Sequence, residues 1–329
     1  MVFHEQLIHC DLCGSLPNRH FRLITTLILR RWPGSKKCRL RICRDCGLVF
    51  VSPRLEESGY EHYYREVYYQ DHNEEVMLQS ARNHKRDIED IIDWISKSLD
   101  SDGSRPNSMI DVGCGIGDFI TLLGHHYSVE PVALELSHAA AEFARKEYGL
   151  HVMEVDLNKA FDLGARYDFV SAKAVLEHIL SPSQFVTTLK GLLTEHGVLF
   201  LLVPDLRSIV WRFPRSALSR VFKPIHVYEF TKNTITQLLD KCGLEVIEID
   251  ANRGFSSSQK NIYVLAKIKS TKNVSVQTEN WIRTVIYVWL GSVVAAVSSA
   301  IKKVVPTSFV RFLKIIKRKI VAGIMNKAS

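Results

Sequence analysis

Short apolar runs alternate with longer amphipathic stretches through the middle of the chain. The short runs have the length and composition of buried β-strands, and apolar residues at helical spacing fill intervals between them, as at 139–148 and 182–193. This alternation continues for about a hundred residues and predicts an α/β fold, with a parallel sheet covered by helices on both faces. After a first run that leads into Asp111, the predicted strands are 132–135, 152–156, 167–172 and 197–204.

A glycine-rich loop follows the first predicted strand. Asp111 lies at the end of the strand, and Gly113, Gly115 and Gly117 lead into the start of a helix. Glycines let the backbone approach a ligand closely, and the N–H groups of a first helical turn favour its negative end. A dinucleotide-binding loop would need a glycine at position 118, which is Asp118 here. The loop therefore indicates a charged, nucleoside-bearing ligand other than a dinucleotide.

Acidic residues also end the next two predicted strands. Glu135 lies 24 residues after Asp111, where a carboxylate could accept hydrogen bonds from both ribose hydroxyls. Asp156 ends the third strand and suits the amino group of an adenine. Because the carboxyl ends of parallel strands meet at one edge of a sheet, the ligand is expected at that edge.

The motif Asp-x-Gly-x-Gly-x-Gly at 111–117 resembles the first motif of the class I S-adenosyl-L-methionine-dependent methyltransferases. The order of the pieces matches this family from about residue 105 to residue 268. The resemblance implies a doubly wound, Rossmann-like, mostly parallel seven-stranded sheet, an enzyme, and S-adenosylmethionine as the cofactor. The cofactor-binding residues that it implies are Asp111, Gly113, Gly115, Gly117, Glu135 and Asp156.

Two Cys-x-x-Cys pairs near the N-terminus predict a small zinc-ribbon-like module. Four thiolates in a tetrahedral array suit zinc, and Gly14 and Gly47 follow the pairs where a tight turn favours positive φ. No secretion signal is visible, so a reducing compartment is expected and disulfides are disfavoured. Cys38 could replace one ligand or lie buried. The predicted ligands of a structural zinc ion are Cys10, Cys13, Cys43 and Cys46.

A tyrosine-rich stretch at 60–69 follows the cysteine module. This order resembles the front of methyltransferases from sugar-modifying and surface-glycan pathways, where such a segment covers the active site. Tyrosines suit stacking on sugar faces, although each can equally be a half-buried packing residue. The resemblance implies O-methylation of a sugar, a glycan precursor or a related small metabolite.

Two histidines are candidates for the general base that takes a proton from an acceptor hydroxyl. His178 follows the fourth predicted strand, and His226 lies beyond the fifth. Imidazole titrates near neutral pH, which suits proton transfer, but either ring could instead only hydrogen-bond the backbone. Lys173 could contact the substrate or the methyl donor, but it is expected to be a solvated loop residue.

The segment around His178 also resembles a motif of the quinone O-methyltransferases, in which Ser-Glu-Val-Leu-Glu-His holds a divalent metal. The matching stretch is 173–178, and it keeps Glu177 and His178 but has Ala174 in place of the first glutamate. This departure removes one of three metal ligands. The alternatives left open are a quinone or lipid O-methyltransferase, an RNA methyltransferase using the zinc module, and a non-catalytic S-adenosylmethionine-binding module.

Positive charge is concentrated at the C-terminus. Residues 280–329 contain nine Lys or Arg and no Asp or Glu, whereas the rest of the chain has 34 basic and 35 acidic residues. A nearly neutral body gives little support to a nucleic-acid partner. The segment 309–325 predicts a basic amphipathic helix that could lie on an anionic membrane, or else pack on the enzyme or a second subunit.

These patterns predict four parts and a location. The parts are a zinc-ribbon-like module at 1–54, a helical cap or linker at 55–104, a methyltransferase domain at 105–270 and a basic helical tail at 271–329. The expected location is the cytoplasm, with peripheral contact through 281–325 to the inner face of a membrane.

Overall fold

The computed structural model describes most of the predicted catalytic domain and part of the N-terminal module. Asp156 and nearly all of the basic tail lie outside the described residues, as do Tyr64, Tyr68 and Tyr69. The described residues are 5–6, 8–16, 21–28, 37–63, 73–101, 103, 105–155, 164–208, 222, 225–254, 260–270, 282 and 285–286.

Within the described residues, the main sheet has seven strands in the order β12-β13-β10-β9-β6-β7-β8. Every neighbouring pair from β10 to β8 is parallel, and β13 is antiparallel to both β10 and β12. The predicted doubly wound, mostly parallel seven-stranded fold is therefore confirmed. The strands are β6 (Met109–Val112), β7 (Val132–Leu134), β8 (His151–Met153), β9 (Tyr167–Lys173), β10 (Leu193–Pro204), β12 (Leu244–Arg253) and β13 (Asn261–Ile268).

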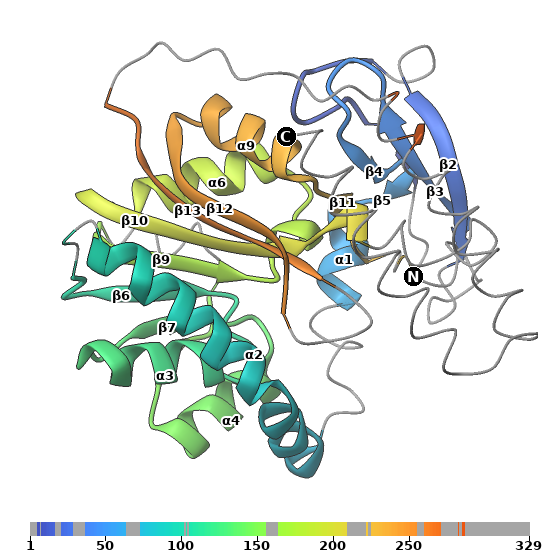
Figure 1. Ribbon diagram of the computed structural model, residues 1–329. Coiled ribbons are helices and arrows are strands. Elements are labelled where there is room, and N and C mark those ends of the chain that lie inside the picture. The colour runs from blue at the N-terminus through green and yellow to red at the C-terminus, as the bar shows by residue number, and fades with distance from the viewer. Residues whose placement is uncertain are drawn as a thin grey trace, which may run out of the picture.

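Helices cover both faces of this sheet (Figure 1). Side chains alternate along a strand, so β10 contributes Phe200 to the core under one set of helices and Leu201 to the core under the other. One face carries α2 (Glu74–Ser101), α3 (Asp118–Tyr127) and α4 (His138–Tyr148), and the other carries α6 (Pro182–Gly191) and α9 (Lys232–Lys241).

The strand order reverses beside β6. The chain passes from β6 to β7 and β8 on one side and then returns to β9 on the other side. Such a reversal opens a crevice at the carboxyl ends of the two central strands, where ligands of open α/β sheets bind. The glycine loop follows β6 at this point, so the fold places the loop at the expected edge.

A second sheet belongs to the N-terminal module, and a strand that lies between β10 and α9 in the sequence completes it. The order is β11-β4-β3-β2, with β11 antiparallel to β4. Its strands are β2 (Phe21–Ile28), β3 (Lys37–Cys43), β4 (Val49–Val51) and β11 (Tyr228–Glu229), while β1 (Glu5–Gln6) pairs with β5 (Arg54–Leu55) and α1 (Glu57–His62) follows. The module therefore lies against the catalytic domain (Figure 1).

Among the helical segments that the structure describes, none is both long and apolar enough to cross a membrane.

Candidate functional site

The glycine loop adopts a backbone that side chains would obstruct. Gly113 has φ of 73° and Gly117 has φ of 82°, both in the left-handed region. A Cβ on Gly113 would lie 2.7 Å from Val175 Cγ2, and one on Gly117 would lie 2.9 Å from both Ala144 and Leu150. These glycines are needed for close packing as well as for the turn.

Hydrogen bonds hold the glycine loop against the end of β7. The N–H groups of Gly113 and Cys114 both donate to the carbonyl oxygen of Leu134, at 2.8 and 3.0 Å. Gly115 N donates to Glu135 Oε2 at 2.8 Å. Burial raises the pKa of Glu135. The structure thus brings Glu135 to the loop, as the sequence predicts.

Asp111 has a buried carboxyl group, and only one of its two oxygens is hydrogen-bonded among the described residues. Ser171 Oγ donates to its Oδ1 at 2.6 Å, while Oδ2 has no hydrogen-bond partner among the described residues. Burial raises the pKa of Asp111 to about 7. A cationic ligand would satisfy the second oxygen and restore the charge, so the site fits the sulfonium- and ammonium-bearing S-adenosylmethionine.

Two residues near the loop have surroundings that the sequence did not indicate. Lys173 ends β9 rather than lying in a solvated loop, and its Nζ is 3.9 Å from Asp118 Oδ1 and 5.8 Å from the ring centre of Phe119. The expectation of a solvated residue is wrong because the strand continues one residue further. Leu136 follows Glu135 and is 36% exposed, which gives an apolar surface beside the acid.

The two candidate bases come together although 48 positions separate them in the sequence. The ring centres of His178 and His226 are 4.8 Å apart and the rings meet edge to face. His178 Nδ1 lies 3.1 Å from the carbonyl oxygen of Ile225. A carbonyl only accepts, so Nδ1 carries the proton and Nε2 of a neutral ring keeps a lone pair.

Each histidine has a buried glutamate beside it. Glu177 Oε1 lies 3.9 Å from His178 Nε2, and Glu229 Oε1 lies 3.6 Å from His226 Nδ1. The sequence motif pointed to Glu177, but Glu229 was missed. The spacing of three residues from His226 was its only signal.

The histidines also lie close to the glycine loop. His178 belongs to the short 3-10 helix η2 (Leu176–His178), which follows directly on Val175, the residue that occupies the space beside Gly113. The turn that carries His178 therefore follows the carboxyl end of β9, next to the glycine loop that follows β6, where the ligand crevice is expected.

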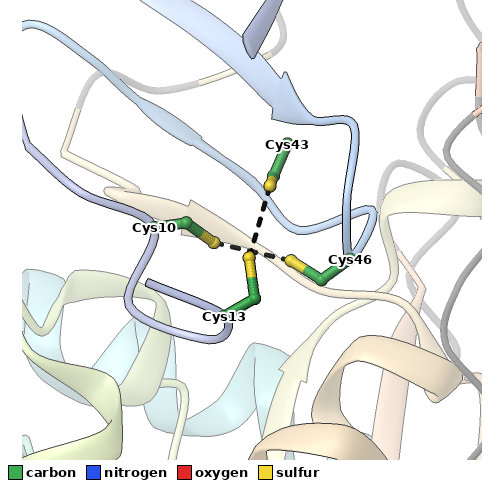
Figure 2. Close-up of side chains that lie close together, drawn as sticks. All are labelled: Cys10, Cys13, Cys43 and Cys46. Atoms are coloured by element: carbon green, nitrogen blue, oxygen red, sulfur yellow. Dashed lines mark hydrogen bonds between the residues drawn. The ribbon is translucent and has the colours of Figure 1, made fainter. Parts of the chain in front are cut away.

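The four predicted zinc ligands converge (Figure 2). Cys10 Sγ is 3.5 Å from Cys46 Sγ, Cys13 Sγ is 3.6 Å from Cys43 Sγ, and all four sulfurs lie within 4.8 Å of one another. Tetrahedral zinc with Zn–S bonds of about 2.3 Å needs sulfurs about 3.8 Å apart, so the cluster has the right size.

The two knuckles share one backbone pattern. Gly14 N donates to Cys10 O and Gly47 N donates to Cys43 O, and both glycines have the predicted positive φ, 76° and 77°. Cys38 is buried in β3 outside the cluster of four.

Arg54 and Asp11 connect the cysteine module to the turn that carries His178. Buried Arg54 donates from Nη2 to Leu180 O at 2.9 Å and from Nη1 to Tyr228 Oη at 3.1 Å. Asp11, between two zinc-ligand candidates, accepts hydrogen bonds from Ser183 N and Oγ at the start of α6, at 2.9 and 3.1 Å. Neither residue stood out in the sequence, because both act through partners far along the chain.

The tyrosines of the front segment that the structure describes are packing residues. Tyr60 and Tyr63 are only 4% and 8% exposed and belong to the core shared by the cysteine module and the catalytic domain. This favours the packing interpretation for these two rings over stacking on a sugar.

Comparisons with known proteins give a family and several similar folds. A family model described as a methyltransferase domain matches residues 80–249. Magnesium protoporphyrin IX methyltransferase from Synechocystis PCC 6803, with bound SAH, has a TM-score of 0.43 and 18% identity, covering 59% of this chain and 87% of its own. The plantazolicin methyltransferase BpumL, in complex with SAH, has a TM-score of 0.48 and 14% identity, covering 64% and 94%. The PH0226 protein from Pyrococcus horikoshii OT3 has a TM-score of 0.45 and 17% identity, covering 63% and 96%. No curated protein matches the sequence.

The family match covers more than half of the chain, and the chain belongs to the methyltransferase domain family. With the seven-stranded fold and the glycine loop, this makes it an enzyme, a class I S-adenosylmethionine-dependent methyltransferase. The predictions of fold, enzyme class and methyl donor are confirmed at this level. The acceptor is a separate question.

Proposed function

We propose that this enzyme methylates a hydroxyl group of a sugar, a glycan precursor or a related small metabolite. The observation that carries the proposal is the pairing of His178 and His226, whose ring centres are 4.8 Å apart. His178 lies on the turn next to the glycine loop. An activated methyl donor needs an aligned acceptor and, for a hydroxyl, a base within reach, and this pair offers imidazole nitrogens at the expected end of the sheet.

Residues around the glycine loop would hold the donor. Gly113, Gly115 and Gly117 supply close backbone, Glu135 suits the ribose hydroxyls, and Asp111 offers its unsatisfied oxygen to the positive end. Asp156, outside the described residues, stays a predicted contact to the adenine. The donor supplies a methyl group already activated on a sulfonium.

His178 or His226 would take the proton from the acceptor hydroxyl. His178 is the better prepared of the two, because its Nδ1 donates to Ile225 O and leaves Nε2 with a lone pair. Glu229 beside His226 Nδ1 favours a proton on that nitrogen and so orients the second ring in the same way.

The four cysteines would bind a structural zinc ion. Their convergence and the twin knuckles support this assignment, and the small N-terminal sheet gains a cross-link that its limited core needs. We further propose that the basic tail, 281–325, contacts an anionic membrane from the cytoplasmic side. Its charge pattern supports this, and liposome flotation with and without residues 280–329 tests it.

The acceptor class is tested by radiolabel transfer. Zinc-loaded enzyme with S-adenosylmethionine labelled in the methyl group is incubated with pooled sugar nucleotides, lipid-linked glycans, prenylated phenols and total RNA. Transfer into the first or second pool, lost in His178→Ala or His226→Ala, supports the proposal. Transfer only into prenylated phenols or RNA favours those alternatives, and donor binding without transfer to any pool favours a non-catalytic module.

A further inference from the structure

The histidine pair belongs to a larger cluster with the composition of a metal site. Donor atoms of Glu177, His178 and His226 all lie within 4.8 Å of one another. His226 comes from a segment 48 residues beyond His178, so it is the fold and not a local motif that joins them. The position that the quinone-type motif fills with a glutamate is Ala174 here, and His226 supplies a third donor from elsewhere.

From this geometry we propose that Glu177, His178 and His226 bind a divalent first-row transition-metal ion. Two imidazoles and one carboxylate form a three-ligand set that leaves coordination positions open. Imidazole donors favour ions such as zinc, cobalt or iron over magnesium, which prefers oxygen ligands alone. The site is separate from the four-cysteine cluster, whose thiolates form a closed tetrahedral set.

The surroundings of both rings suit metal ligands. Metal-binding histidines usually pass their other N–H to a carbonyl or carboxylate, which fixes the ring. His178 Nδ1 does so to Ile225 O, and His226 Nδ1 lies 3.6 Å from Glu229 Oε1. In a neutral ring fixed through Nδ1–H, Nε2 carries the lone pair that a metal ion takes. Glu177 and Glu229 are only 1% and 2% exposed, and two buried carboxylates favour a cation over a neutral ligand.

The inference deepens the proposed function and rests on it for its chemical consequence. An ion occupying the Nε2 atoms would exclude their use as a free base. Its open positions would instead receive the acceptor hydroxyl and lower the pKa of that hydroxyl, so that the proton passes to solvent water and the oxygen attacks the methyl carbon. Two neighbouring oxygens, as in the vicinal hydroxyls of a sugar or a catechol, would chelate such an ion, which narrows the acceptor class.

Enzyme carrying a single equivalent of zinc, which the four thiolates bind in preference, is titrated with Co²⁺ in a calorimeter. This tests the second site directly, with no need for an acceptor. The wild type is expected to bind one equivalent without the near-ultraviolet absorption of cobalt thiolates, which would report entry into the cysteine cluster. Glu177→Gln and His226→Ala are expected to lose this binding, and Glu229→Gln to weaken it about 10- to 100-fold. His196→Gln, at an exposed histidine on β10, is the matched control and keeps it.

Absence of Co²⁺ binding by the wild type, or equal binding by Glu177→Gln and His226→Ala, would overturn the proposal. Circular dichroism melting establishes that each variant is folded, and Glu177→Gln preserves side-chain shape where His226→Ala does not. S-adenosylmethionine is titrated into the same samples. Binding of S-adenosylmethionine without binding of Co²⁺ refutes the metal site alone. Failure to bind S-adenosylmethionine refutes the proposed function, and the Co²⁺ titration still tests the metal site.

Discussion

In the protein without a ligand, the carboxyl group of Asp111 is buried and only partly hydrogen-bonded, and a bound cation would compensate for both conditions. Burial raises the pKa of Asp111 to about 7, and Oδ2 has no hydrogen-bond partner among the described residues. The folded state therefore binds a proton more tightly than the unfolded chain, in which an aspartate titrates near pH 4. The contribution of this group to stability is full below about pH 4 and is lost as the pH rises towards 7.

Asp111→Asn should separate binding from stability. Asparagine still accepts from Ser171 but carries no charge, so the fall in the free energy of unfolding between pH 5 and pH 8 should be smaller than in the wild type. Affinity for S-adenosylmethionine should drop about 10- to 100-fold, the worth of a hydrogen bond between charged groups. Urea unfolding at the two pH values and calorimetry measure the two effects. An unchanged pH slope together with unchanged affinity would remove Asp111 from the site.

Gly117 allows a second comparison at this scale. Gly117→Ala meets both a left-handed φ and close contacts with Ala144 and Leu150, whereas Gly149→Ala meets a left-handed φ of 65° with nothing within 4 Å. Both should lose about 1–2 kcal/mol from the backbone, and Gly117→Ala about 1–3 kcal/mol more from overpacking. Urea unfolding of the two variants gives the difference, and equal losses would mean that helix α4 yields to the methyl group.

At the scale of elements, the turn after β9 depends on the N-terminal module. Arg54 in β5 donates to Leu180 O, two residues beyond His178, and Tyr228 Oη donates to the same oxygen at 3.2 Å. Pairing of β11 with β4 fixes the segment that carries His226, since Val51 N donates to Val227 O at 2.9 Å. Both histidines are thus positioned from outside the main sheet.

Arg54→Met tests this positioning role. The variant keeps length and packing but loses both hydrogen bonds, so stability should fall by about 1–3 kcal/mol and kcat several-fold. Affinity for S-adenosylmethionine should stay unchanged, because the hydrogen bonds of Arg54 go to Leu180 and Tyr228, outside the glycine loop. Arg39→Met, at an exposed arginine on β3, is the matched control. A loss of donor affinity equal to the loss in kcat would point to general destabilisation instead.

At the scale of the whole molecule, the features that the sequence predicted correctly are those formed by neighbouring residues or determined by the order of the strands. Gly113 to Gly117 follow a strand directly, and Glu135 is brought to them because parallel strands end at one edge. The contacts that were missed join distant segments: Ser171 to Asp111, Arg54 to Leu180 and β11 to β4. Periodicity and motif spacing carry no information on such pairings. Asp156 and the membrane role of the tail stay predictions.

Removal of zinc should reduce methyl transfer through the histidine segments and leave the binding of S-adenosylmethionine largely unchanged. The cysteine knuckles are joined to the histidine segments through Asp11 at the start of α6 and through β4. The glycine loop instead contributes Cys114 to the core with α2, α3 and α4, on the other face of the sheet. Cys13→Ser should therefore lower zinc content and methyl transfer at least about 10-fold, in line with the loss of a metal ligand. The affinity for S-adenosylmethionine should change little, and hydrogen exchange should rise over 176–183 and 225–229.

Mass spectrometry, calorimetry and radiolabel transfer measure these quantities, with Cys38→Ala as the control that keeps its zinc. Full activity of a zinc-free Cys13→Ser enzyme would show that the two halves of the molecule work independently.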